Sequence, residues 1–354
     1  MPAYTIRSSF IDFMRGLAIM NMVLVHFNYL IPLDIANIIS YLDVAMEGYL
    51  CIAGYMVGWY YYPLYKTGKR NITRRLLERA LKLTIIQYIM IMTISVPLYY
   101  LLYDEIRIKE SIGYFLMKSM LFLNQIGIMH ILPTFIPLLL ISPILLYLVY
   151  HGMSVIIIVV SITLFIFGNI DPYIANVGER TIFPVILWQI YYILGFIIGI
   201  GYGNSNALMS TITKNNKLLF VSFIIMLIAM IMKHAKIVSP QLTTKFPLNA
   251  LGLYYGSSLL LFTSTLFGRT WDSIRKSWIV NDVVCLLGRH SLFVFVFHVY
   301  IAKGFEAYRH HYDLSILANI ILVGLCFVLM YIYIIKSENM QQTKWWGRIL
   351  EAIR

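Results

Sequence analysis

The chain has 354 residues, of which 60% are apolar and 12% are charged, and its mean hydropathy is +0.77. A soluble domain usually has about 25% charged residues, so this composition excludes an ordinary soluble protein. The net charge of +12 does not indicate nucleic-acid binding, because the basic residues lie in short loops between apolar runs. Basic residues in such loops are explained by the orientation of membrane helices, since cytoplasmic loops are rich in Lys and Arg.

Apolar runs long enough to cross a membrane recur along the whole chain. A spanning helix needs about 20 mostly apolar residues, and lipid offers a bare backbone no hydrogen-bond partner. The sequence therefore predicts an all-α, polytopic membrane protein with about ten transmembrane helices, in one domain of residues 1–336. The predicted spans are 10–31, 37–62, 76–103, 129–150, 153–169, 182–201, 217–233, 247–267, 283–302 and 314–335. Residues 337–354, which include "KWWGRILEAIR", predict a cytoplasmic tail lying along the membrane interface.

The loop after the second predicted helix is strongly basic. Its Lys and Arg residues are Lys66, Lys69, Arg70, Arg74, Arg75, Arg79 and Lys82. Cytoplasmic loops carry an excess of Lys and Arg. This loop therefore predicts a multi-pass protein of the plasma membrane with both termini in the cytoplasm.

The first predicted helix, "FIDFMRGLAIMNMVLVHF", contains Asp12, Arg15 and His26. Charged side chains at membrane depth are costly, so each marks a candidate functional site. Arg15 and His26 are almost three turns apart, so they lie on one side of the helix, about 16 Å apart along its axis. Asp12 shares the face of Arg15. The alternative is an interfacial Asp–Arg pair with a histidine near the outer headgroups.

The second predicted helix adds two carboxylates, Asp43 and Glu47, on one face of its outer half. A carboxylate beside His26 would orient the ring and raise its basicity. Gly54 and Gly58 follow at the GxxxG spacing, which predicts close packing against another helix.

Later helices contain two histidines, His130 and His298, at a similar predicted depth. No spacing in the sequence establishes that they meet His26, and a structural role is an equal alternative for each. Trp188 and Gln189 interrupt the sixth predicted helix, and an interhelical hydrogen bond is the alternative to a role in the site. No HExxH or comparable pair is present, so no metal site is expected.

Several of these segments resemble the membrane-bound acyltransferase family 3. Arg15 and His26, with ten residues between them, resemble the signature of its first helix. The surrounding "IDFMRGLAIMNMVLVHF" is also similar to the heparan-alpha-glucosaminide N-acetyltransferase relatives. Four stretches resemble the OpgC-like branch, the succinyltransferases of osmoregulated glucans: "EGYLCIAGYMVGWYYYPLYKTGKRNITRRLLERALKL", "GIMHILPTFIPLLLISPILL", "FPVILWQIYYILG" and "LGRHSLFVFVFHVYI". Ala53 stands where that branch usually has Ser.

This resemblance implies transfer of an acetyl or succinyl group from cytoplasmic acyl-CoA to a hydroxyl of an extracytoplasmic carbohydrate. It implies that His26 is catalytic and that Arg15 helps to bind the donor. Asp12, on the same face of the helix, would hold Arg15 in place. The basic residues that could attract the CoA phosphates are Arg74, Arg75 and Arg79, although membrane orientation also explains them. Acyl-CoA is expected as a substrate, and no bound cofactor is expected.

General-base catalysis is the mechanism that these residues suggest. His26, oriented by Glu47 or Asp43, would take the proton of the acceptor hydroxyl, which attacks the thioester. His130 or His298 would donate a hydrogen bond to the oxyanion. A covalent acyl-histidine remains open. The residues that could also line the site are Asp43, His130, His298, Gln189 and Trp188.

The main alternative is a proton-coupled transporter or exporter, because membrane-embedded Asp, Arg and His also form proton relays. No inverted repeat or matched pair of broken helices supports it. A non-catalytic scaffold is a third alternative, and it predicts little effect of substitutions at Arg15 or His26.

Overall fold

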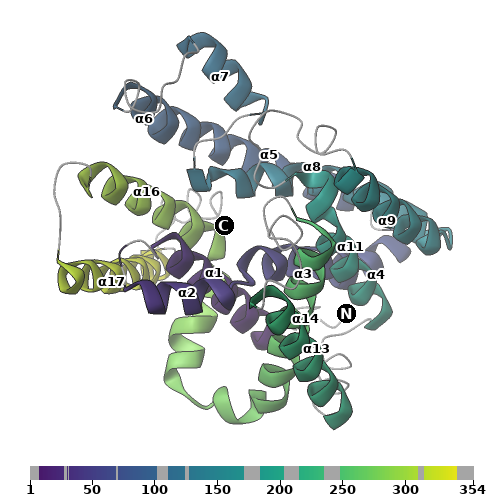
Figure 1. The fold of residues 1–354 in the computed structure, drawn as a ribbon. Helices are drawn as coiled ribbons and strands as arrows, with labels where there is room; N and C mark the ends of the chain where they lie inside the picture. The colour runs from purple at the N-terminus through teal and green to yellow at the C-terminus, as the bar shows by residue number, and fades with distance from the viewer. Residues whose placement is uncertain are drawn as a thin grey trace. The chain divides into compact units, whose positions relative to one another are not determined.

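The computed structural model describes residues 8–27, 30, 32–68, 71–101, 111–123, 127–170, 184–202, 215–234, 248–309 and 315–340. Every regular element among these residues is a helix (Figure 1), which confirms the predicted all-α fold. The chain divides into two compact units. Unit 1 consists of Met1–Tyr49, Met209–Phe223 and Leu259–Arg354, and unit 2 consists of Leu50–Leu208 and Ile224–Ser258.

Helix α1 (Ser9–His26) lies in backbone contact with α15 (Cys285–Arg289) in unit 1. A Cβ atom added at Gly16 would overlap the carbonyl oxygen of Val284, and one added at Gly288 would overlap that of Asp12. Only glycine fits at such crossings, where the two backbones approach most closely. The two glycines therefore set the distance between α1 and α15.

Both ends of α1 are held by further contacts within unit 1. Phe10 and Phe13 pack against Trp271 of α14 (Ala250–Ile274), with ring centroids 5.4 and 5.3 Å apart. Nearer the other end, Oδ1 of Asn21 accepts a hydrogen bond of 3.2 Å from the backbone N–H of Val44. This bond ties α1 to the junction between α2 (Leu33–Tyr41) and α3 (Ala45–Met56).

The predicted ninth span, 283–302, is bent rather than straight. Residues Ile279–Arg289 and Ser291–Glu306 meet at an angle of 82°. The π-helix η6 (Ile279–Val284) and α15 precede the bend, and α16 (Ser291–Arg309) follows it. Sharp bends usually occur at π-helical turns and at small residues, and Gly288 and Ser291 flank this one. The bend lets α15 lie on α1 while α16 follows a different axis.

In unit 2, α11 (Val185–Tyr202) packs on α3 and the π-helix η2 (Val57–Tyr61) through two interlocked glycine pairs. Cβ atoms at Gly54 and Gly58 would overlap the carbonyls of Tyr192 and Phe196. In return, Cβ atoms at Gly195 and Gly199 would overlap those of Cys51 and Tyr55. The close packing predicted for Gly54 and Gly58 is confirmed, and its partner motif is Gly195-x-x-x-Gly199.

Unit 2 contains two further closely packed helix pairs. Helix α5 (Ile72–Met90) lies along α8 (Ile131–Tyr150), and α9 (Ser154–Ile170) lies along α11 (Figure 1). The remaining described elements of the chain are α4 (Tyr62–Lys66), η3 (Ile91–Ser95), α6 (Val96–Leu101), α7 (Ile112–Met120), η4 (Gly127–His130), α13 (Asn216–His234) and α17 (Ile316–Met340).

Six described helices are long and apolar enough to cross a membrane. They are Ser9–His26, Asp34–Lys66, Ile72–Tyr100, Ile128–Tyr150, Ala250–Ile274 and Leu317–Lys336. The bent pair at His290 adds a seventh if it forms one span. Three more apolar helices, Ser154–Ile170, Val185–Gly201 and Asn216–Met232, are shorter than a full span. The predicted count of about ten is therefore not confirmed by the described part of the chain.

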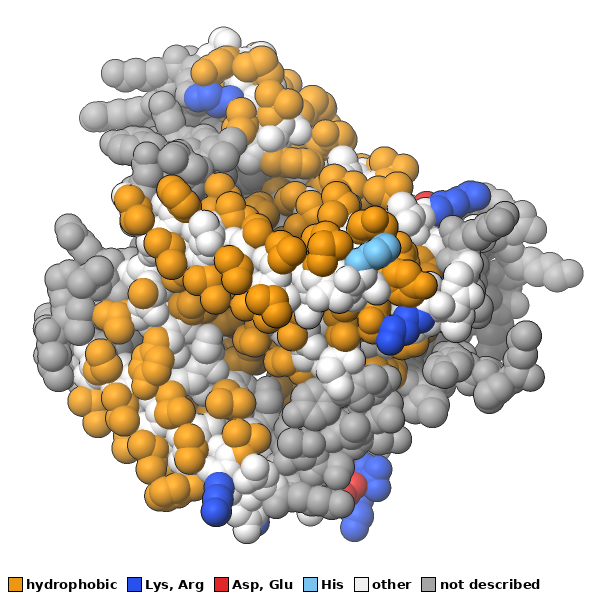
Figure 2. All heavy atoms as spheres, turned by 90° about the vertical axis from the view of Figure 1, so that its right-hand side faces the viewer, with side chains coloured by type: hydrophobic (Ala, Val, Ile, Leu, Met, Phe, Trp, Pro, Cys, Tyr) orange, Lys and Arg blue, Asp and Glu red, His pale blue; other side chains and the backbone are white. Residues whose placement is uncertain are grey.

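Large apolar side chains are exposed along these helices. Figure 2 shows one face on which hydrophobic side chains spread broadly, with few Lys and Arg side chains. The exposed residues of α9 include Val155, Ile156, Val159, Ile162 and Phe167. Exposing so large an apolar surface to water is energetically unfavourable, whereas exposing it to lipid is not. The helices therefore form a membrane protein. The predicted boundary at residue 336 stays a prediction, because residues 341–354 lie outside the described residues.

We expect Gly195→Ala to lower the unfolding temperature in detergent, because its methyl group meets the Cys51 carbonyl and overpacking costs about 1–3 kcal/mol. Gly201→Ala, in the same helix, is the matched control. Its methyl group meets no described atom within 4 Å, and alanine favours a helix by about 0.5–1 kcal/mol over glycine. Equal stability of the two variants would contradict the interlocked glycine packing.

Candidate active site

Two histidines from opposite ends of the chain meet in unit 1. Nδ1 of His26, the last residue of α1, lies 2.8 Å from Nε2 of His298 in α16. The ring planes are within 6° of parallel and the ring centroids are 5.1 Å apart. His298 is fully buried, whereas His26 is partly exposed. The sequence left open whether these residues meet, and the structure joins them by a hydrogen bond.

The second ring nitrogen of each histidine has a different environment. Nδ1 of His298 lies 3.1 Å from the carbonyl oxygen of Val294, one turn earlier in α16. Nε2 of His26 makes no hydrogen bond to any residue that the structure describes. His26 is therefore the more accessible member of the pair for proton transfer with a bound molecule.

The ion pair expected between Asp12 and Arg15 in α1 is present. Nη1 of Arg15 lies 3.7 Å from Oδ1 of Asp12, and the Asp12 side chain is almost completely buried. The i, i+3 spacing therefore brings them onto one face, as predicted. Arg15 retains 24% of its side-chain exposure.

The two carboxylates predicted to orient His26 have other surroundings. Oδ1 of Asp43 accepts a hydrogen bond of 3.0 Å from the backbone N–H of Ala45, at the start of α3. Glu47 is 1% exposed and lies in the first turn of α3. No hydrogen bond joins either carboxylate to His26 among the described residues. The neighbour of His26 Nδ1 is His298 instead.

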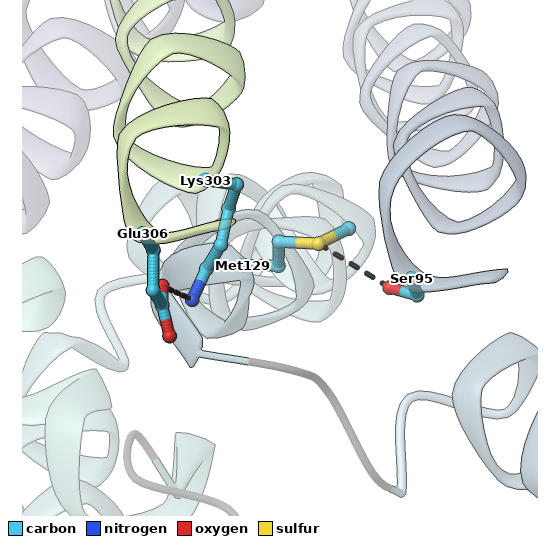
Figure 3. Close-up of polar contacts among 4 residues, drawn as sticks. All are labelled: Ser95, Met129, Lys303 and Glu306. Atoms are coloured by element: carbon cyan, nitrogen blue, oxygen red, sulfur yellow. Dashed lines mark hydrogen bonds and ion pairs between the residues drawn. The ribbon is translucent and has the colours of Figure 1, made fainter. Parts of the chain in front are cut away.

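Sequence reasoning missed Lys303, which lies on α16 five residues after His298. Its ammonium group forms an ion pair with Glu306, one turn further along the helix (Figure 3). Lys303 is only 9% exposed. Lys303 directly follows the predicted span 283–302, where a lysine at the end of a membrane helix is ordinary, so the sequence offered no distinct signal for it.

His130 belongs to unit 2, where it ends η4 and directly precedes α8. Two hydrogen bonds hold the preceding residue, Met129. Nε2 of Gln87 donates to its carbonyl oxygen at 3.3 Å, and the Ser95 hydroxyl donates to its sulfur at 3.4 Å (Figure 3). These bonds fix the backbone beside His130, which is buried.

Gln189 joins two helices of unit 2. Its Oε1 accepts a hydrogen bond of 2.7 Å from the Ser161 hydroxyl, and its Nε2 donates to the Ser161 carbonyl at 2.8 Å. The amide thus links α11 to α9, which is the interhelical hydrogen bond given as the alternative to a role in the site. Trp188 is fully buried and packs at 5.8 Å from the Tyr191 ring.

A basic pocket of about 440 Å³ lies within unit 2. Its lining residues are Met56, Tyr60, Tyr61, Arg75, Glu78, Arg79 and Lys82. The Arg79 guanidinium lies 5.7 Å from the Tyr61 ring centroid. Three cations beside two phenol rings suit a ligand with phosphate groups and a flat ring.

Arg74 does not line this pocket, but it is paired with Glu78, which does. Its Nε donates a hydrogen bond of 2.7 Å to Oε1 of Glu78, and its side chain is 79% exposed. Of the three predicted arginines, Arg75 and Arg79 line the pocket. In the described part of the chain, no group of three or more His, Cys, Asp and Glu side chains could hold a metal ion.

A family model described as OpgC protein matches residues 7–342. This match confirms the resemblance to the OpgC-like branch seen in the sequence. No curated protein and no solved structure matches the chain.

The Ser161–Gln189 link gives a stability prediction. We expect Ser161→Ala and Gln189→Leu each to lower the unfolding temperature in detergent, and we expect their combined effect to be less than the sum. Interhelical hydrogen bonds in membranes are worth about 0.6 kcal/mol on average and up to about 1.7, which is the coupling expected from a double-mutant cycle. Strict additivity would contradict the link.

Proposed function

Because the chain belongs to the OpgC family of membrane-associated, glycan-modifying acyltransferases, we propose that it transfers an acyl group from acyl-CoA to a hydroxyl of an extracytoplasmic glycan. The observation that supports this proposal best is the His26–His298 pair, which leaves one nitrogen of a partly exposed imidazole for proton transfer. Acetyl and succinyl are both candidates for the acyl group.

His26 acts as the general base in this proposal. Its Nε2 takes the proton of the acceptor hydroxyl while the hydroxyl oxygen attacks the thioester carbonyl carbon. The new C–O bond forms, the C–S bond breaks, and the CoA sulfur leaves with the proton that His26 had taken. Base and acid are then the same nitrogen, and the ring returns to its starting state.

Negative charge develops on the thioester oxygen during attack and needs a nearby donor or cation. Lys303 is buried on α16, the helix of His298, and its ammonium group is paired with Glu306, which makes this cation a candidate for that role. Nε2 of His298, one of the donors expected from the sequence, is already engaged with His26. His130 stays a candidate for the same role.

The donor requires contacts for its phosphates, its nucleotide and its thioester. The pocket formed by Arg75, Arg79 and Lys82 with its two tyrosines has the charge and ring surfaces that suit a nucleotide diphosphate. Arg15, paired with Asp12 in α1, is a separate candidate for a contact with the donor. We propose that the basic segment, and with it both termini, faces the cytoplasm of the plasma membrane, where acyl-CoA is found.

The transporter alternative also gains from the histidine pair, because hydrogen-bonded histidines can pass a proton. Purified protein in lipid vesicles with labelled acyl-CoA and a glucan acceptor distinguishes the two. The enzyme releases free CoA and adds the label to the glucan. A transporter moves an unmodified solute and leaves acyl-CoA intact.

We expect His26→Gln to reduce acyl transfer by about 10²- to 10⁴-fold, which is the usual contribution of a general base. Free CoA and the mass of the glucan report turnover, and thermal unfolding shows that the variant is folded. His151→Gln is the control, because that exposed histidine contacts its own helix at Tyr147. Normal turnover by folded His26→Gln would remove His26 from the chemistry.

We expect Arg79→Gln to raise the KM for acyl-CoA by about 10-fold or more with little change in kcat, since a hydrogen bond to a charged group is worth about 1.5–3 kcal/mol. Arg74→Gln should have a smaller effect, because Arg74 is largely exposed and does not line the pocket. Arg275→Gln controls for net charge, since it removes an exposed arginine paired with Asp272. Equal KM values for all three variants would rule out the pocket as the donor site.

A further inference from the structure

The hydrogen bonds of His298 determine which nitrogen of His26 is available as a base. Nδ1 of His298 lies 3.1 Å from the Val294 carbonyl oxygen. A carbonyl oxygen only accepts hydrogen bonds, so Nδ1 of His298 must carry the N–H. A neutral imidazole has one N–H, and Nε2 of His298 therefore presents a lone pair.

This lone pair defines the proton position on His26. Nδ1 of His26 lies 2.8 Å from Nε2 of His298, and a hydrogen bond at this distance needs one donor. Because Nε2 of His298 accepts, Nδ1 of His26 carries the N–H. Nε2 of His26 is then unprotonated, and it is the nitrogen with no hydrogen bond to the described residues. The ring planes lie within 6° of parallel and the ring centroids are 5.1 Å apart, which about equals the 2.8 Å between the nitrogens plus the two ring radii. The rings are therefore nearly coplanar, and the N–H can point along the lone pair.

The same contact also favours the protonated form that arises during the reaction. When Nε2 of His26 takes the proton of the acceptor hydroxyl, the ring becomes an imidazolium, and its Nδ1–H donates more strongly to His298. Charge-assisted hydrogen bonds are roughly twice as strong as neutral ones. His298 keeps its own N–H on Val294 throughout, so no second proton has to move.

We propose that His298 is a positioning residue that holds His26 as the tautomer with a free Nε2 and stabilises its imidazolium. This proposal rests on the proposed role of His26 as the general base. A carboxylate has this task in the serine protease triad. Here a neutral imidazole, anchored to the backbone of its own helix at Val294, does so while burying no extra charge, which lipid-facing helices would penalise.

Two substitutions test separately whether the acceptor nitrogen of His298 or its flat ring is required. His298→Phe keeps a flat ring beside His26 and removes both nitrogens. His298→Gln loses the ring and keeps a side-chain oxygen that can accept from Nδ1 of His26. If His298 acts as an acceptor, the Phe variant loses about 10²-fold in kcat, as expected for a displaced general base. The Gln variant then stays within about 10-fold of wild type, and the KM for acyl-CoA changes little in both. The reverse order, an active Phe variant and an inactive Gln variant, would overturn the proposal.

The tautomer itself can be measured without turnover. Protein with ¹⁵N-labelled histidine, reconstituted in lipid, gives separate signals for protonated and unprotonated ring nitrogens, and His26→Gln identifies the signals of His26. We expect His26 to carry its proton on Nδ1 in the wild type and to populate the Nε2–H form in His298→Phe. A wild-type His26 protonated on Nε2 would overturn the proposal.

The outcomes also separate this proposal from the proposed function. If folded His26→Gln turns over normally, the general-base assignment fails whatever His298 does. If His26→Gln is inactive and His298→Phe retains full kcat, only the positioning role of His298 fails.

Discussion

Helices α1 and α15 lie in backbone contact, since Gly16 and Gly288 leave no side chain between them. This contact holds α1 beside the segment that leads, through the bend at His290, into α16. Its consequence appears two turns into α16, where His298 meets the last residue of α1. A Cβ atom at either glycine would overlap a backbone carbonyl oxygen of the other segment, so a larger residue would push the two backbones apart. The histidine pair therefore depends on a helix crossing at some distance from it.

Lipid explains why small residues and short polar links recur in this protein. Apolar side chains gain nothing by leaving lipid for another apolar surface, so helices associate through close packing and hydrogen bonds. Unit 2 uses both devices, with interlocked glycine pairs between α3–η2 and α11 and the Gln189–Ser161 link between α11 and α9. From sequence alone, the polar side chains that make such contacts cannot be told apart from residues of a functional site. Gln189 has such an interhelical hydrogen bond, whereas Asp43 has a local one to the backbone of Ala45.

The proposed chemistry makes two separate demands, and different parts of the chain supply them. A base must keep one nitrogen free, which the His26–His298 pair of unit 1 provides. A donor with phosphates must be bound by cations, which unit 2 gathers in the pocket of Arg75, Arg79 and Lys82. The burial of Lys303 beside Glu306 adds a cation within unit 1. Each demand has its own variants, so kcat and KM can report on them independently.

The sequence by itself determined the properties that depend on composition and on neighbours along one helix. Its hydropathy required membrane helices, its motifs indicated the OpgC family, and the i, i+3 spacing placed Asp12 beside Arg15. The tertiary structure decided which histidine meets His26, which glycines face Gly54 and Gly58, and which arginines share a pocket. It also divided the expected ninth helix in two. The physical reason is that periodicity reports the face on which a side chain lies. Which other helix covers that face depends on crossings between segments as distant as residues 26 and 298, and those crossings depend on the packing of the whole unit.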